Sequence, residues 1–181
     1  MNKCNVIVGR FQPLTKGHMK MILEGYNENH LPTIILQIPN KKFDEKHPFS
    51  DELIHDEIDF LINNGYNKFI VGHFYINNAD IKKIAEICHN NNFEPVLWIC
   101  GTDRFENYSR QANSEKYKID NNLLMEFRCL EIKRTDDDIS ATKVREAIIN
   151  DDFETYNKMI PNGIDKEFFN RFKQELNDLK K

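Results

Sequence analysis

The chain has 181 residues, of which 40% are hydrophobic and 30% are charged, and it contains only seven Gly and six Pro. This composition favours one globular domain over the whole chain, 1–181, and excludes a disordered or linker-rich protein. The formal net charge of −4 argues against general binding to a nucleic-acid backbone. The N-terminal apolar run is too short for a signal peptide, and no run approaches the roughly 20 apolar residues of a membrane span. We therefore expect a cytoplasmic protein with no nucleic-acid or membrane partner.

The pattern along the chain alternates between strand and helix. Short apolar runs predict five strands, at 4–8, 33–38, 68–71, 95–100 and 127–132. Apolar residues at helical spacing predict helices that follow the first three strands, including one from about Asp51 that Gly65 ends. A further helix begins after Ser140, and two more complete the chain. The fold class is therefore α/β, with an open, mostly parallel sheet covered by helices on both faces.

Cysteine and histidine usage does not indicate a metal centre. The four cysteines are widely spaced and lack a Cys-x-x-Cys pair, which favours small buried residues in a reducing compartment. The six histidines lack metal-ligand spacing. The acidic run Asp136–Asp138 is interpreted as favourable charge near a helix start, with a metal site as the alternative. Trp98, inside the fourth strand, is expected in the core and not on a stacking surface.

Polar loops follow the first, fourth and fifth strands, where open parallel sheets bind ligands. In the first loop, Gly9 and Gly17 permit close backbone approach, and Thr15 and His18 add polar groups near a helix start. These features describe a phosphate cradle, although an ordinary strand-to-helix turn is the alternative. In the third loop, Ser140 caps a helix and Arg145 adds a permanent cation, with ordinary capping and a local ion pair as the alternative.

Two sequence motifs resemble those of a known superfamily. Gly-Arg-Phe-Gln-Pro at 9–13 is followed by Thr-Lys-Gly-His at 15–18, and Ile-Ser-Ala-Thr-Lys-Val-Arg stands at 139–145. Together they resemble the cytidylyltransferase-like nucleotidyltransferases, which include nicotinamide mononucleotide adenylyltransferases, pantetheine-phosphate adenylyltransferases and cytidylyltransferases. The resemblance spans about 4–150, leaves 151–181 as a helical extension, and implies a Rossmann-like fold.

The resemblance also implies a reaction and a set of site residues. An acceptor phosphate attacks the α-phosphorus of ATP or CTP and expels pyrophosphate, with Mg²⁺ arriving on the triphosphate. The implied catalytic residues are His18, Thr15 and Arg145, with Thr15 standing where many adenylyltransferases have His. The implied nucleotide-binding residues are Gly9, Arg10, Phe11, Gln12, Gly17, Gly101, Asp103, Ile139, Ser140 and Thr142.

The acceptor is a small phosphorylated molecule whose identity stays open. The motif at 9–13 and the segment Pro48-Phe49-Ser50 resemble the nicotinamide mononucleotide branch, but 51–55 lacks the Arg that meets the acceptor phosphate there. Lys41, Lys46 and His47 could bind that phosphate instead, with a solvated Lys-rich loop as the alternative.

Two function classes besides a nicotinamide mononucleotide adenylyltransferase-like enzyme remain. One is a cytidylyltransferase or phosphopantetheine adenylyltransferase-like enzyme, and the other is a nucleotide-binding regulator without turnover. The final helix carries Phe168, Phe169 and Phe172 on one side. This face is expected to pack on the sheet, with a partner subunit in a homo-oligomer as the alternative.

Overall fold

The computed structural model describes residues 1–133 and 140–180, which group into two compact units. The first unit contains residues 1–9, 21–38 and 68–136, apart from the undescribed end, and the second contains 10–20, 39–67 and the C-terminal part. Each unit is built from segments that are distant in the sequence. The expectation that 1–181 forms one domain stays a prediction.

The first unit is built on a five-stranded parallel sheet with the order β3-β2-β1-β4-β5. Its strands are β1 (Asn2–Gly9), β2 (Thr33–Gln37), β3 (Ile70–Tyr75), β4 (Phe93–Gly101) and β5 (Arg128–Ile132). The prediction of an α/β fold with an open parallel sheet is confirmed. Because the chain runs outward from β1 in both directions, the strand order reverses between β1 and β4, the position where open sheets of this kind bind ligands.

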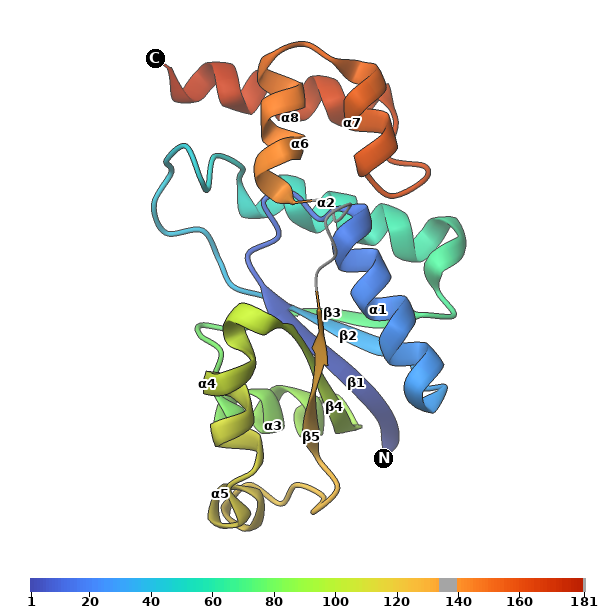
Figure 1. Cartoon of the computed structure of the whole chain (residues 1–181), viewed down its shortest axis with the longest axis vertical. Helices are drawn as coiled ribbons and strands as arrows, with labels where there is room; N and C mark the ends of the chain where they lie inside the picture. The colour runs from blue at the N-terminus through green and yellow to red at the C-terminus, as the bar shows by residue number, and fades with distance from the viewer. Residues whose placement is uncertain (134–139, 181) are drawn as a thin grey trace. The chain divides into compact units, whose positions relative to one another are not determined.

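Helices cover both faces of this sheet (Figure 1). The helices α3 (Ile81–Asn90) and α4 (Thr102–Ala112) share one apolar cluster with a face of the sheet. Within that cluster Trp98 is fully buried and stacks on Tyr108 with ring centroids 4.2 Å apart, so the core assignment of Trp98 is confirmed. On the opposite face lies α1 (Lys16–Asn29), where Gly25 approaches so closely that a Cβ would collide with the Ile99 side chain.

A polar side-chain pair holds the end of α1 to β1. Asn5, fully buried in β1, donates from Nδ2 to the carbonyls of Gly25 and Leu31 and to Asn29 Oδ1. Asn29 Nδ2 donates back to Asn5 Oδ1 at 2.7 Å. This exchange satisfies a buried amide and fixes the path of the chain from α1 into β2. The four cysteines are free and buried in the same unit, as predicted.

Two helices in the first unit were not expected from the sequence. These are α4 and α5 (Glu115–Asp120), which follow β4 directly. We expected a loop at 101–104, but Gly101 is already the residue before the first turn of α4. The helix α4 buries only Tyr108 and Ala112, so its apolar spacing is too sparse to reveal a helix in the sequence.

The second unit is helical. It contains α2 (Asp51–Leu61), the short wider turn η1 (Ile62–Tyr66), α6 (Ala141–Ile149), α7 (Phe153–Met159) and α8 (Lys166–Leu179). Gly65 has a φ of 109°, which a side chain would resist, and it interrupts the helical backbone inside η1. We predicted Gly65 as the end of the helix, but α2 already ends at Leu61. The three C-terminal helices contact one another and appear together in Figure 1.

The apolar face of α8 packs on helices of its own unit. Phe172 lies 4.8 Å from Phe49, and Phe168 lies 5.6 Å from Phe60 at the end of α2, measured between ring centroids. Phe169 meets Tyr156 of α7 at 4.9 Å. The expectation that this face packs on the sheet is therefore corrected: its partners are α2, α6 and α7. The reason is that α2 and α7 present aromatic side chains of their own, which match the phenylalanines in size and polarity.

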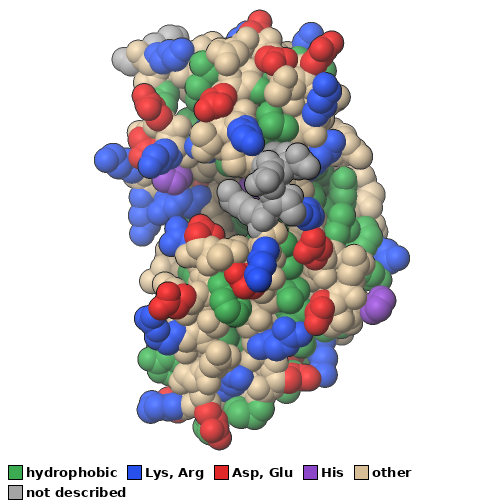
Figure 2. Space-filling model, in the orientation of Figure 1, with side chains coloured by type: hydrophobic (Ala, Val, Ile, Leu, Met, Phe, Trp, Pro, Cys, Tyr) green, Lys and Arg blue, Asp and Glu red, His purple; other side chains and the backbone are tan. Residues whose placement is uncertain are grey.

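Charge is mixed over the face of the molecule drawn in Figure 2, where basic and acidic side chains are interspersed. Among the described residues, no helix has the length and apolar character to cross a membrane.

Candidate functional site

The first loop ends in a tight turn that begins α1. Thr15 is buried, and its hydroxyl accepts hydrogen bonds from the backbone N–H groups of Gly17 at 3.1 Å and His18 at 3.5 Å. Its carbonyl accepts from the N–H of Met19. Thr15 is therefore the N-cap of α1, a role that its residue type favours. The contact of Thr15 with nucleotide phosphate that the resemblance implies stays a prediction.

The ring of His18 is held by the same turn. The backbone N–H of Thr15 donates to His18 Nδ1 at 3.0 Å, and Thr15 Oγ1 lies 3.3 Å from the same nitrogen. Because Nδ1 accepts a hydrogen bond, a neutral ring carries its proton on Nε2. The edge of Phe11 packs against the ring at a centroid distance of 5.1 Å. The turn thus presents a half-buried imidazole in one orientation and one tautomer.

Gln12 and Phe11 shape the loop rather than project from it. Both side chains are buried, and Phe11 adopts a left-handed backbone with φ of 54°. The Gln12 amide pairs with the backbone of Phe49: Oε1 accepts from its N–H at 2.8 Å, and Nε2 donates to its carbonyl at 3.1 Å. Gln12 therefore ties the first loop to the 48–50 segment.

Arg145 joins the third polar loop to the first. Ser140 caps α6 by accepting from the N–H of Lys143 at 3.2 Å, as predicted. One turn further on, Arg145 Nη1 donates to the carbonyl of Gln12 at 2.7 Å, and Nη2 lies 3.3 Å from Thr142 Oγ1. Only 8% of Arg145 is exposed, and this burial lowers the pKa of its guanidinium. Two motifs separated by more than 100 residues are therefore in direct contact.

The loop at 40–47, proposed for the acceptor phosphate, is ordered by its own polar groups. Asp44 accepts from the N–H groups of Lys46 and His47, and its carboxylate lies 3.2 Å from His47 Nδ1. Asn40 Nδ2 donates to the carbonyls of His47 and Phe49. Lys41 and Lys46 are exposed. The loop thus presents exposed lysines on a backbone held by hydrogen bonds, while His47 is already paired with Asp44.

The start of α2 is held from the C-terminal helix. Ser50 caps α2 by accepting from the N–H of Leu53 at 3.2 Å. The Glu175 carboxylate of α8 accepts from both the N–H and the hydroxyl of Ser50, at 2.7 and 2.9 Å. Asp51 is the first residue of the stretch 51–55, which lacks the Arg of the nicotinamide mononucleotide branch. Its carboxylate accepts from the N–H of Asn40 at 2.6 Å.

The remaining predicted residues lie at other places. Gly9 and Gly101 end β1 and β4 in the first unit, and Asp103 stands in the first turn of α4. Arg10 is exposed, and Gly17 is half-buried within the first turn of α1. Ile139 and the run Asp136–Asp138 lie outside the described residues.

One important residue escaped the sequence analysis. Glu57 is fully buried on α2, and its Oε1 accepts from the N–H of Leu14 at 3.0 Å. The signal was present in the sequence, since Glu57 stands within the apolar stripe formed by Ile54, Ile58 and Leu61. Desolvation by burial raises the pKa of Glu57 well above its usual value, although the Leu14 N–H works in the opposite direction.

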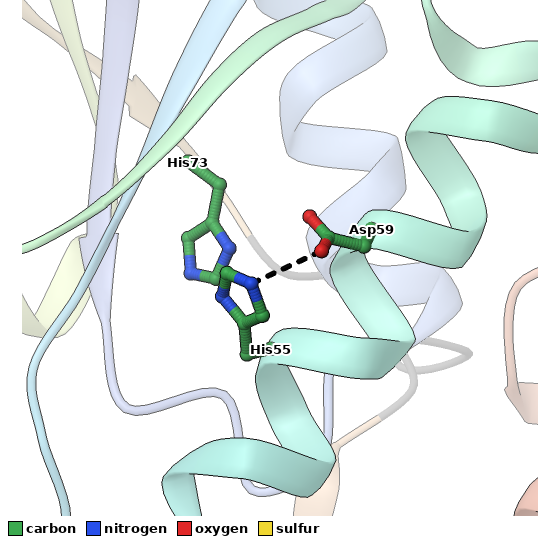
Figure 3. A group of neighbouring side chains, drawn as sticks. All are labelled: His55, Asp59 and His73. Atoms are coloured by element: carbon green, nitrogen blue, oxygen red, sulfur yellow. Dashed lines mark ion pairs between the residues drawn. The ribbon is translucent and has the colours of Figure 1, made fainter.

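The helix α2 also carries an ion pair on its more exposed side. His55 Nε2 lies 3.0 Å from Asp59 Oδ2, one helical turn away (Figure 3). This spacing is that of an ordinary pair at i and i+4. The expectation of no protein-bound metal centre stays a prediction.

Comparison with known proteins identifies the family and the fold. A family model described as cytidylyltransferase-like matches residues 6–147. Comparison with the sequences of curated proteins finds no significant match.

Solved structures resemble the chain over nearly its whole length. The nicotinic acid mononucleotide adenylyltransferase of Plasmodium falciparum is 15% identical, with 99% of this chain and 98% of that chain covered and a TM-score of 0.58. The bifunctional NMN adenylyltransferase/ADP ribose pyrophosphatase of Francisella tularensis is 17% identical, with 98% and 54% covered and a TM-score of 0.53. Thermotoga maritima TmcAL, bound with alpha-thio ATP, is 12% identical, with 98% and 56% covered and a TM-score of 0.56. At these identities the likeness establishes the Rossmann-like fold that the motifs implied.

Proposed function

Because the chain belongs to the cytidylyltransferase-like family and is therefore a nucleotidyltransferase, we propose that it transfers the adenylyl group of ATP to the phosphate of a pyridine mononucleotide. The choice of ATP and of this acceptor is supported by the names of two structural neighbours, the nicotinic acid mononucleotide and NMN adenylyltransferases. The Gly-Arg-Phe-Gln-Pro and Pro-Phe-Ser segments of this chain support the same choice. CTP, phosphopantetheine and sugar or alcohol phosphates are the alternatives that the assay below compares.

The observation that carries the proposal is the contact between the two motifs. Arg145 Nη1 lies 2.7 Å from the carbonyl of Gln12, three residues before the N-cap of α1. The contact brings the start of α6 to the loop that bears His18. We infer from this contact that the N-termini of α1 and α6, the Arg145 cation and the His18 imidazole act on one ligand. Such a combination of groups suits a polyphosphate.

The chemistry requires alignment more than a protein nucleophile. An acceptor phosphate oxygen attacks the α-phosphorus of ATP, the bond from that phosphorus to the bridging oxygen breaks, and pyrophosphate leaves with the electron pair. His18 donates from Nε2 to a phosphate oxygen, and Arg145 stabilises the growing negative charge from its buried position. Thr15 acts through the turn, by capping α1 and orienting the His18 ring.

Mg²⁺ is proposed to enter with the triphosphate as part of the substrate. The loop at 10–20 contains no Asp or Glu, so it offers cations and N–H groups and no carboxylate ligand. This donor set fits phosphate oxygens, which Mg²⁺ uses readily as ligands. Removal of Mg²⁺ with EDTA is expected to stop pyrophosphate release, and added MgCl₂ is expected to restore it.

A cytoplasmic location is proposed on the basis of the four buried, unpaired cysteines. Free thiols persist in reducing compartments, whereas oxidising ones favour disulfides.

The assay measures pyrophosphate release from ATP or CTP with each acceptor class. The expected result is release with ATP and a pyridine mononucleotide, and its loss in His18→Ala. His30→Asn is the matched control, because His30 is an exposed histidine at the opposite end of α1. Asn tolerates the positive φ of that position. Nucleotide binding without pyrophosphate release from any pair would favour the regulator class.

A further inference from the structure

Glu57 is the one buried carboxyl among the residues that the structure describes. Its side chain emerges from the second turn of α2 and reaches the first loop, where Oε1 accepts from the N–H of Leu14 at 3.0 Å. The second oxygen, Oε2, is buried without a hydrogen-bond partner. Burying a carboxyl costs free energy that a Leu at the same position would not, so the bond to Leu14 is the contact that offsets this cost.

The place where Glu57 binds is one residue from the group that sets the His18 ring. Residues 13–15 lie directly before α1, and they provide two backbone N–H groups, those of Leu14 and Thr15, because Pro13 has none. The first is held by Glu57, and the second donates to His18 Nδ1. Because successive peptide planes share a Cα atom, fixing the plane before Leu14 restricts the direction of the Thr15 N–H.

The opposite side of the loop is held separately. Gln12 is bound through its side chain to Phe49 and through its carbonyl to Arg145. These contacts fix the loop before Pro13, whereas Glu57 fixes it after Pro13. Of the side chains of Gln12, Arg145 and Glu57, that of Glu57 is therefore the one that restrains the loop after Pro13, next to the His18 turn.

We propose that Glu57 is a positioning residue, which sets the orientation and tautomer of His18 through the Leu14 N–H. This inference rests on the proposed function for its effect on turnover, but its effect on the His18 ring is independent of that function. A neutral side chain with an oxygen at the same place should do the same work. The geometry, and not a negative charge, is what the loop requires.

The test compares Glu57→Gln with Glu57→Leu. Gln retains an oxygen that accepts from Leu14, whereas Leu fills the space without one. Glu57→Gln is expected to keep the wild-type kcat, and Glu57→Leu is expected to lower kcat about 10- to 100-fold with a smaller change in KM. Nitrogen-15 NMR of the His18 ring should show Nδ1 as acceptor in wild type and Glu57→Gln, and a mixture of tautomers in Glu57→Leu.

The controls separate positioning from general stability. Tyr156→Phe removes another buried polar group without a hydrogen-bond partner, a hydroxyl whose pKa is raised first by burial and then by the nearby Glu57 carboxyl. This variant should keep kcat and the His18 signals. If Glu57→Leu does not fold, Glu57→Met, which is flexible and lacks an oxygen, takes its place.

Two outcomes overturn the inference. One is a folded Glu57→Leu protein with wild-type kcat and an unchanged His18 tautomer. The other is a Glu57→Gln protein that loses turnover as severely as Glu57→Leu. If wild-type protein releases no pyrophosphate from any substrate pair, the proposed function fails, and the His18 ring signals alone decide the role of Glu57.

Discussion

The starts of α1 and α6 are built alike but hold their candidate site residues differently. Each begins with a hydroxyl cap, Thr15 in one and Ser140 in the other. His18, in the first turn of α1, is half-buried and is oriented by a backbone N–H. Arg145, in the second turn of α6, is buried, and its Nη1 donates a hydrogen bond to the carbonyl of Gln12. The ring of His18 is therefore partly exposed, as its proposed role requires, whereas Arg145 also bonds α6 to the first loop.

The largest expected effect is that of His18→Ala. Loss of the Nε2 donor should lower kcat about 100- to 1,000-fold, because a donor aimed at developing charge contributes mainly in the transition state. The free energy of unfolding should fall by less than about 1.5 kcal/mol, since the ring accepts one backbone hydrogen bond. Steady-state kinetics and urea unfolding measure the two quantities. A variant that keeps wild-type kcat would remove His18 from the mechanism.

Arg145→Ala should lower both activity and stability. Removing a charged donor from the Gln12 carbonyl should reduce the free energy of unfolding by about 1.5–3 kcal/mol, in addition to reducing kcat. Urea unfolding followed by circular dichroism gives the first quantity, and pyrophosphate release gives the second. If stability is unchanged, the contrast between the two helix starts is wrong. Lys143→Ala is a suitable control, because Lys143 is exposed on the same helix.

The buried acid of α2 should make stability depend on pH. Because the folded-state pKa of Glu57 is raised, the native protein binds more protons than the unfolded chain above the ordinary pKa of a Glu. The contribution of Glu57 is therefore fully present at acid pH and is lost as pH rises through the folded-state pKa, with a slope of at most about 1.4 kcal/mol per pH unit. Burial also raises the pKa of the nearby Tyr156 hydroxyl, which therefore stays neutral while Glu57 titrates.

The measurement is the difference in unfolding free energy between wild type and Glu57→Gln from about pH 5 to about pH 9. The amide does not titrate, so the variant should gain relative to wild type as pH rises. A constant difference over this range would show that Glu57 does not titrate there.

The smallest expected effect is that of Thr15→Ala. The cap on α1 is lost, at a cost of about 0.5–2 kcal/mol in stability. The backbone N–H that holds His18 remains, so kcat should fall by no more than about threefold, less than 1 kcal/mol of barrier. Thr15→Ser should restore the cap. A large loss of turnover in Thr15→Ala, reversed in Thr15→Ser, would show that the hydroxyl itself takes part in the reaction.

Most of the sheet was predictable because apolar β-branched runs have few other uses in a chain of this composition. The strand β3 shows the limit of that signal. We expected it at 68–71, but it spans Ile70–Tyr75, because Gly72 and His73 interrupt the apolar run. His73 is accommodated by Gln37 of the neighbouring strand at 2.8 Å, a contact that depends on strand order. The helices α4 and α5 were missed for a related reason, since they bury too few side chains to show a period.

The residues of the candidate site could be predicted from the sequence, but the hydrogen bonds between them could not. The two motifs predicted His18, Ser140 and Arg145 as site residues, because each stands at a fixed position within a short motif. Arg145 and Glu57 bond to the backbone carbonyl of residue 12 and the backbone N–H of residue 14. Nearly every residue type has these backbone groups. Such contacts leave no trace in residue types, so they emerge only when the chain is folded. The charged residue within the apolar stripe of α2 was the one available sign.

The clamp between Glu175 and Ser50 links the last helix to a segment that precedes it by 125 positions. Deleting residues 166–181 would therefore do more than shorten a tail. The first turn of α2 would lose an external anchor, and the Phe49 backbone that receives Gln12 adjoins that turn. Engineering at the C-terminus, such as fusion of a reporter, is best judged by its effect on substrate turnover and not by yield alone.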